Sequence, residues 1–181
     1  MSRFSGYLVM GLAMCVLEMC AAGRTGLNSL PEQKPNSNQI VLHDHGRSTT
    51  LDQHSAFFKD VLTESNSLFL EADTSYRLLM SQERIVNLKQ REVALEIKFS
   101  AVQSGDVLKG HKVHFTSLLI PLSGQFADGT VFFAGKWERQ NEHQELKYAS
   151  LQDYLPANFV RNTRGLNRLK EQLKKMAITV D

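Results

Sequence analysis

The sequence has few cysteines, and none of them lies in the body of the chain. Its 181 residues include two cysteines, Cys15 and Cys20, both close to the N-terminus. If the first segment is removed, no thiol remains, which excludes a disulfide framework and thiol catalysis. Asn-x-Ser/Thr glycosylation sites are also absent. This absence gives no support to a eukaryotic secretory route and favours a bacterial cell envelope.

A long apolar run is lacking as well. The run at residues 7–17 has 11 residues, whereas a membrane-spanning helix needs about 20. Arg3 precedes this run and small residues follow it at 21–23, which is the pattern of a secretory signal. We therefore expect residues 1–23 to be a signal peptide or an N-terminal anchor. The protein is then exported and periplasmic or membrane-associated, or secreted if the host is a eukaryote.

Lipid attachment is an alternative form of export. Bacterial lipoprotein signals end in a cysteine that becomes the lipidated first residue, and the sequences before Cys15 and Cys20 are distorted versions of that pattern. Methionine stands directly before each cysteine, and Glu18 worsens the fit of the second. Lipidation at Cys15 or Cys20 is therefore a weaker candidate than cleavage of a signal peptide near Ala22.

Two further regions follow the first segment. Residues 24–50 contain two prolines and several asparagines without a lasting period, which predicts a flexible linker. Residues 51–181 are long enough to bury a core, and we expect them to form a single α+β domain.

The strand signals lie in the middle of that domain. Apolar residues alternate with polar or small ones at 92–101, and a second strand is predicted at 111–121, with a bulge near Ser117 where the alternation changes. Asp128-Gly129 then favours a type I′ hairpin turn, because both residues tolerate a positive φ. We expect an antiparallel meander of three to five strands.

Helical periodicity flanks the strands. A helix is expected from Leu51, with Thr49 or Thr50 as its N-cap, and a second one is expected around residues 79–86. Near the C-terminus a leucine stripe at residues 163–176 predicts an amphipathic helix, capped by the residue at 162 or 163. The fold class is α+β, with an N-terminal helix or helices and a C-terminal amphipathic helix.

The positive charge is concentrated in that last helix. Residues 24–160 carry 14 Lys and Arg against 16 Asp and Glu (−2), whereas residues 161–181 carry 6 against 2 (+4). The cations are Arg161, Arg164, Arg168, Lys170, Lys174 and Lys175. They are either the solvated face of a docked helix or a surface for an anionic membrane or an acidic protein partner. Nucleic acid is excluded, because the domain as a whole is not basic.

Aromatic residues give a second candidate surface. Phe132 and Phe133 are adjacent in a predicted strand and therefore point to opposite faces. Either helices cover both faces, or apolar surface remains for a partner or an apolar ligand. Phe132 and Trp137 are therefore candidate contact residues.

Candidate chemistry is sparse. His43, His45 and His54 lie within twelve residues and are possible zinc ligands, although no apolar framework surrounds them. The carboxylates Glu92, Glu96 and Glu138 are expected on solvated faces or ends of strands. Motifs of serine hydrolases, zinc proteases, dinucleotide-binding proteins and phosphate-binding loops are absent. We expect neither a cofactor nor an enzymatic activity.

These features favour an exported protein that acts by binding, as a component of a cell-envelope or membrane-associated assembly. The first alternative is a carrier of a lipid or other apolar ligand. The second is a metal-dependent enzyme that uses the three histidines.

Overall fold

Six antiparallel strands and three helices make up the part of the chain that the structure describes. The computed structural model describes residues 35–74, 80–108, 110–138, 151 and 153–175. In chain order the elements are β1 (Gln39–Asp44), β2 (Arg47–Thr50), α1 (Ala56–Leu70), α2 (Gln82–Arg91), β3 (Val93–Val107), β4 (His111–Pro121), β5 (Thr130–Trp137), β6 (Tyr154–Arg161) and α3 (Thr163–Lys175). The α+β class is confirmed.

The strands form one sheet in the order β2-β1-β3-β4-β5-β6. From β3 to β6 the strands follow one another as a meander, and each neighbouring pair is antiparallel. The predicted bulge is present, because the register of β4 against β5 shifts between Phe115 and Ser117. The predicted end of β4 at Pro121 is also confirmed. The meander β3–β6 has four strands, within the predicted three to five, and two further strands that were not predicted bring the sheet to six.

The additional strands are a hairpin within the predicted linker. β1 and β2 are joined by His45 and Gly46, whose φ angles of 47° and 84° belong to a type I′ turn. On its other side β1 pairs with β3, which adds the hairpin to the sheet. The linker prediction is therefore wrong for residues 39–50. The strand signal of this hairpin is weak because Ile40 is its only residue that is both apolar and fully buried.

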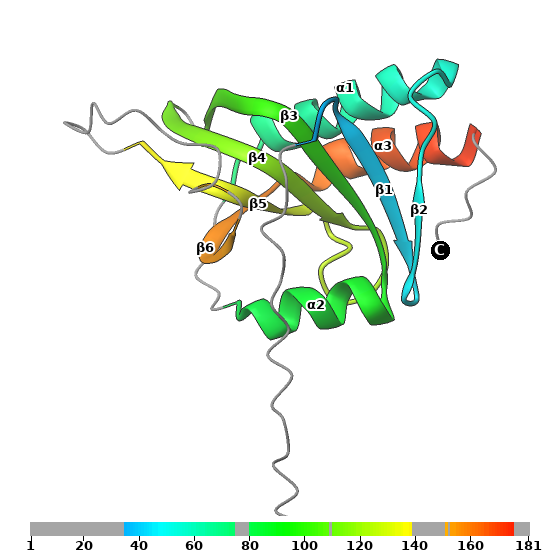
Figure 1. Ribbon diagram of the computed structural model, residues 1–181. Helices are drawn as coiled ribbons and strands as arrows, with labels where there is room; N and C mark the ends of the chain where they lie inside the picture. The colour runs from blue at the N-terminus through cyan, green and yellow to red at the C-terminus, as the bar shows by residue number, and fades with distance from the viewer. Residues whose placement is uncertain (1–34, 75–79, 109, 139–150, 152, 176–181) are drawn as a thin grey trace, which may run out of the picture. The chain divides into compact units, whose positions relative to one another are not determined.

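Helices cover both faces of the sheet (Figure 1). α1 and α3 pack side by side on one face, and α2 lies on the opposite face. The C-terminal amphipathic helix is confirmed, since Leu166, Leu169 and Leu173 are buried in the core that α1 shares. Its predicted stripe also included Met176, which lies outside the described residues.

Two apolar cores result from this arrangement. The larger core lies beneath α1 and α3 and contains Phe133, whose ring packs edge to face on that of Phe69 with the ring centroids 5.2 Å apart. The smaller core lies beneath α2 and contains Phe132. The centroid of its ring lies 5.4 Å from that of Phe126 and 5.9 Å from that of Phe159. Phe132 and Phe133 point to opposite faces of the sheet, and both are buried because helices cover both faces.

The helix starts differ in part from expectation. α1 begins after Ser55, whose hydroxyl accepts a hydrogen bond from the Phe57 amide, while Thr49 and Thr50 belong to β2. At α3 the expected cap is confirmed, because Asn162 Oδ1 accepts a hydrogen bond from the Gly165 amide at 2.9 Å.

Asp128 and Gly129 do not form the predicted two-residue turn. They end the connection between β4 and β5, and only Gly129 has a positive φ, at 91°. A Cβ on Gly129 would collide with the main chain of Asn162, where β6 passes into α3. Glycine is needed here both for its φ and for this close approach.

We expect Gly129→Ala to destabilise the protein more than Gly110→Ala. Gly110 has a similar φ of 102° but open space around it, so its substitution reports backbone strain alone, about 1–3 kcal/mol. The collision at Gly129 adds about 1–3 kcal/mol, the usual range for overpacking. Urea unfolding of the two variants measures the difference, and equal losses would show that the close approach is unimportant.

Candidate functional site

A carboxylate lies buried under α2. Glu96 occupies the face of β3 opposite to Leu95 and Ile97, and only 3 % of its surface is exposed. The expectation that Glu96 is solvated is therefore wrong. The predicted alternation of β3 is present, but α2 covers this face of the strand and removes the carboxylate from water.

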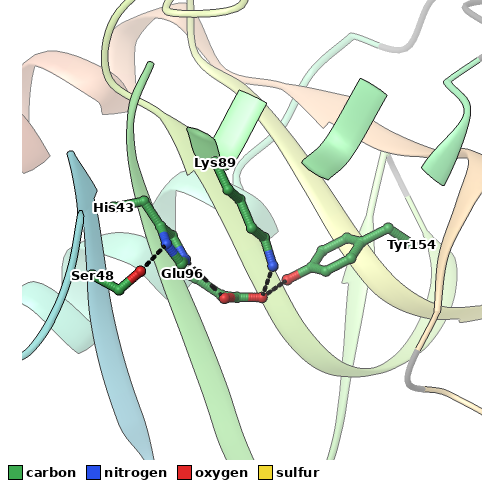
Figure 2. A network of polar contacts seen from close by, with 5 residues as sticks. All are labelled: His43, Ser48, Lys89, Glu96 and Tyr154. Atoms are coloured by element: carbon green, nitrogen blue, oxygen red, sulfur yellow. Dashed lines mark hydrogen bonds and ion pairs between the residues drawn. The ribbon is translucent and has the colours of Figure 1, made fainter. Parts of the chain in front are cut away.

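Three side chains from distant parts of the chain satisfy this carboxylate (Figure 2). His43 Nε2, on β1, lies 2.9 Å from Oε2. Lys89 Nζ, on α2, and the hydroxyl of Tyr154, on β6, donate to Oε1 at 2.6 Å and 2.9 Å. Lys89 Nζ also lies 5.2 Å from the centroid of the Tyr154 ring. The carboxylate is thus held from both oxygens.

The network continues to the surface through the imidazole. His43 Nδ1 lies 3.0 Å from the hydroxyl of Ser48, on β2 (Figure 2). His43 itself is 8 % exposed, whereas every residue of β2 is exposed. We call Ser48, His43, Glu96, Lys89 and Tyr154 the Glu96 network. It joins the solvent-facing edge of the sheet to a carboxylate in the interior.

The electrostatics favour an ionised carboxylate. Burial alone would raise the pKa of Glu96, but the hydrogen bond from His43 and the charges of Lys89 and Lys98 outweigh it and lower the pKa to about 2. An ionised carboxylate only accepts hydrogen bonds, so His43 Nε2 must carry a proton. In the neutral imidazole, Nδ1 then presents its lone pair to Ser48.

A second serine–histidine–carboxylate set lies near the other end of β3 and β4. Ser104 Oγ lies 2.7 Å from His114 Nδ1, and His114 Nε2 lies 3.4 Å from Glu138 Oε2. Glu138 also pairs with Lys112 at 3.2 Å, and this hydrogen bond lowers the pKa of Glu138. The expectation of a solvent-accessible carboxylate fits Glu138, which remains in contact with water.

The predicted metal ligands do not form a site. His43 belongs to the Glu96 network, His45 contacts Asp44 at the exposed hairpin turn, and His54 is exposed before α1. Within the described ranges, no three His, Cys, Asp or Glu side chains are grouped to hold a metal ion. The three histidines therefore contact different partners, although they lie within twelve residues of one another in the sequence.

The two predicted aromatic contact residues are both engaged in packing. Phe132 is 2 % exposed within the smaller core, so the structure contradicts its assignment to a contact surface. Trp137 is partly buried against the larger core, with its ring 5.4 Å from that of Phe133. Burial of Phe132 follows from the position of α2, which the sequence did not reveal.

The six predicted cations lie on or just before α3. Arg161 pairs with Asp128 at 2.7 Å, and Arg168 pairs with Glu64 at 3.2 Å and Glu71 at 2.7 Å. The remaining four are Arg164, Lys170, Lys174 and Lys175, of which all but the partly buried Lys170 are exposed. Lys174 contacts Glu171, and Lys175 contacts the neutral side chain of Gln172.

Residues 1–34, including the lipidation candidates Cys15 and Cys20, lie outside the described residues. In the part of the chain that is described, each helix is too short or too polar to cross a membrane. Comparison of the chain with protein-family models, curated proteins and solved structures finds no match.

We expect Glu96→Gln to remove a pH-dependent part of the stability. The folded-state pKa of Glu96, about 2, lies below its ordinary value of 4.5, so ionisation stabilises the fold above pH 4.5. That contribution, on the order of 3 kcal/mol, disappears as the pH falls towards 2. Urea unfolding between pH 2 and pH 7 measures the difference between wild type and variant.

The matched control is Glu138→Gln, which removes a water-exposed carboxylate with a lowered pKa. Screening by solvent should leave its effect small at every pH. A constant stability difference for Glu96→Gln across the same pH range would contradict an ionised, network-stabilised Glu96.

Proposed function

We propose that the protein is an exported binding protein that contacts an anionic surface in the cell envelope through the outward face of α3. Export rests on the N-terminal pattern at residues 1–23. The proposed contact surface follows from the packing of α3, whose leucines are buried in the core of the domain. Anionic lipid headgroups at a membrane surface are the partner that we propose.

The orientation of α3 is the observation that carries this proposal. Leu166, Leu169 and Leu173 are buried against α1 and the sheet, so the opposite face of the helix meets solvent. This face contains Arg164, Lys174 and Lys175, and its last turn is basic. Cations in a membrane-facing segment contribute about 1 kcal/mol each to binding of anionic lipid.

Neighbouring acids neutralise only part of this face. Glu64 and Glu71, from α1 and its C-cap, pair with Arg168. Glu171 is the only acidic residue within α3, and it pairs with Lys174. Within the described residues, the end of α3 therefore carries more cationic than acidic side chains.

The apolar-ligand alternative has less support. The aromatic ring expected to line such a site, that of Phe132, packs against Phe126 and Phe159. Among the described residues, the large apolar side chains classed as exposed are Leu70 and Val86. These two lie on different helices, α1 and α2, on opposite faces of the sheet.

We expect charge reversal at the end of α3 to weaken membrane binding. Full-length wild type and the variant Lys174→Glu/Lys175→Glu are sedimented with vesicles containing phosphatidylglycerol or phosphatidylcholine alone. At about 1 kcal/mol per cation, the variant should lose roughly tenfold or more in partitioning to the anionic vesicles. Binding to the zwitterionic vesicles should be unchanged.

The matched control is Arg47→Glu/Arg91→Glu, which changes the net charge by the same amount. Arg47 is on the exposed β2 and Arg91 ends α2, on the other face of the sheet from α3. Equal losses in both variants would point to net charge alone, and no loss in either would refute α3 as the lipid-binding face.

A further inference from the structure

An exposed serine stands at the end of a buried histidine–carboxylate pair. We propose that Ser48 is a nucleophile that accepts acyl groups from carboxylic esters, with His43 as its general base and Glu96 as the residue that positions the imidazole. This inference goes beyond the binding role proposed above, and it departs from the expectation that the protein is not an enzyme.

The direction of the hydrogen bonds prepares the serine for reaction. With Glu96 ionised, the neutral imidazole of His43 carries its proton on Nε2, 2.9 Å from Glu96 Oε2, and its Nδ1 lone pair then faces Ser48 Oγ at 3.0 Å. The serine hydroxyl can therefore donate its proton to the imidazole. A nucleophile in contact with a base, itself oriented by a third group, is the arrangement that activates serine in unrelated enzymes.

The burial of the three groups is graded in the direction that catalysis requires. Glu96 and His43 are 3 % and 8 % exposed, whereas Ser48 lies on a strand that is exposed along its whole length. A reagent can reach the hydroxyl from solvent. The base and the carboxylate are held in a low-dielectric interior, where their interaction is strong.

The carboxylate is fixed without the help of the histidine. Lys89 Nζ and the Tyr154 hydroxyl both bind Oε1, so Oε2 remains available to His43. Rigid second contacts of this kind keep a catalytic group within the narrow range of productive positions. Figure 2 shows this arrangement, in which the imidazole lies between the carboxylate and the hydroxyl.

The backbone of Ser48 adds a donor at the open side of the strand. Leu51 N donates to Ile40 O at 2.8 Å, which fixes the alternation of hydrogen bonds between β1 and β2. In that alternation His43 and Ser48 are a non-hydrogen-bonded pair. The peptide N–H of Ser48 therefore points away from β1, to the outer edge of the sheet, where a substrate carbonyl oxygen can accept from it.

The acyl transfer proceeds in two balanced steps. Ser48 Oγ attacks the ester carbonyl carbon while its proton passes to His43 Nδ1. The bond from that carbon to the leaving oxygen breaks, and the departing alkoxide takes the proton from His43. Water then attacks the acyl-serine by the same route, which releases the carboxylic acid and restores the hydroxyl.

The test is site-resolved labelling of the full-length protein with diisopropyl fluorophosphate. Phosphorylation by this reagent forms a bond from the serine oxygen to phosphorus and expels fluoride, and peptide mapping by mass spectrometry locates the modified serine. Ser104, next to His114 and the water-exposed Glu138, is the internal control. Ser104 also contacts an imidazole, but His114 lies 3.4 Å from a water-exposed carboxylate, whereas His43 lies 2.9 Å from a buried one. We therefore expect Ser48 to react at least about tenfold faster than Ser104, within the about 10²–10⁴-fold that a well-positioned general base contributes.

Two variants separate activation from mere exposure. Ser48→Ala should abolish labelling of its peptide and the burst of nitrophenolate that p-nitrophenyl acetate releases from wild type, while Ser104→Ala should leave that burst unchanged. Glu96→Gln should slow labelling at Ser48 but not at Ser104, with circular dichroism used to verify the fold.

The comparison of Ser48 with Ser104 needs only the wild-type chain, so it holds even if Glu96→Gln does not fold. Labelling of Ser48 that is no faster than that of Ser104 would overturn the proposal. So would a nitrophenolate burst that survives Ser48→Ala, or a folded Glu96→Gln variant that is labelled at Ser48 at the wild-type rate.

Discussion

The fold depends on keeping one charge inside it. An ionised carboxylate loses its hydration when it is buried, and this loss must be offset by hydrogen bonds and opposite charge. Glu96 obtains both from His43, Lys89 and Tyr154, which lie on β1, α2 and β6. Since the hairpin, the helix and the last strand must all be in place to satisfy it, the carboxylate couples the correct position of each element to that of the others.

The aromatic core imposes a second constraint of the same kind. Phe132 and Phe133 are adjacent on β5 and are both buried, so each face of the sheet needs a helical cover. α1 and α3 cover one face and α2 covers the other (Figure 1). α2 thus closes the smaller core and supplies Lys89 to the carboxylate, whereas the packing of α3 turns its cations towards solvent.

Local patterns predicted much of the fold, and long-range contacts account for the rest. The alternation at β3, the end of β4 at Pro121 and the leucine stripe of α3 were readable because each depends on neighbours in sequence. The hairpin of β1 and β2 was missed because it is mostly polar and is stabilised by pairing with β3. The prediction that Glu96 is solvated was wrong because its burial depends on His43 and Tyr154, which lie 53 and 58 residues away in the sequence.

The protonation of the His43 ring is the most direct measure of whether this network orders the site. In ¹⁵N nuclear magnetic resonance of the full-length protein, the ring nitrogens of the neutral imidazole reveal which one carries the proton. In the neutral ring, the network requires Nε2 to be protonated and Nδ1 to be unprotonated, because ionised Glu96 accepts a hydrogen bond from Nε2. A ring protonated at Nδ1, or one that exchanges between both forms as in free histidine, would contradict the account.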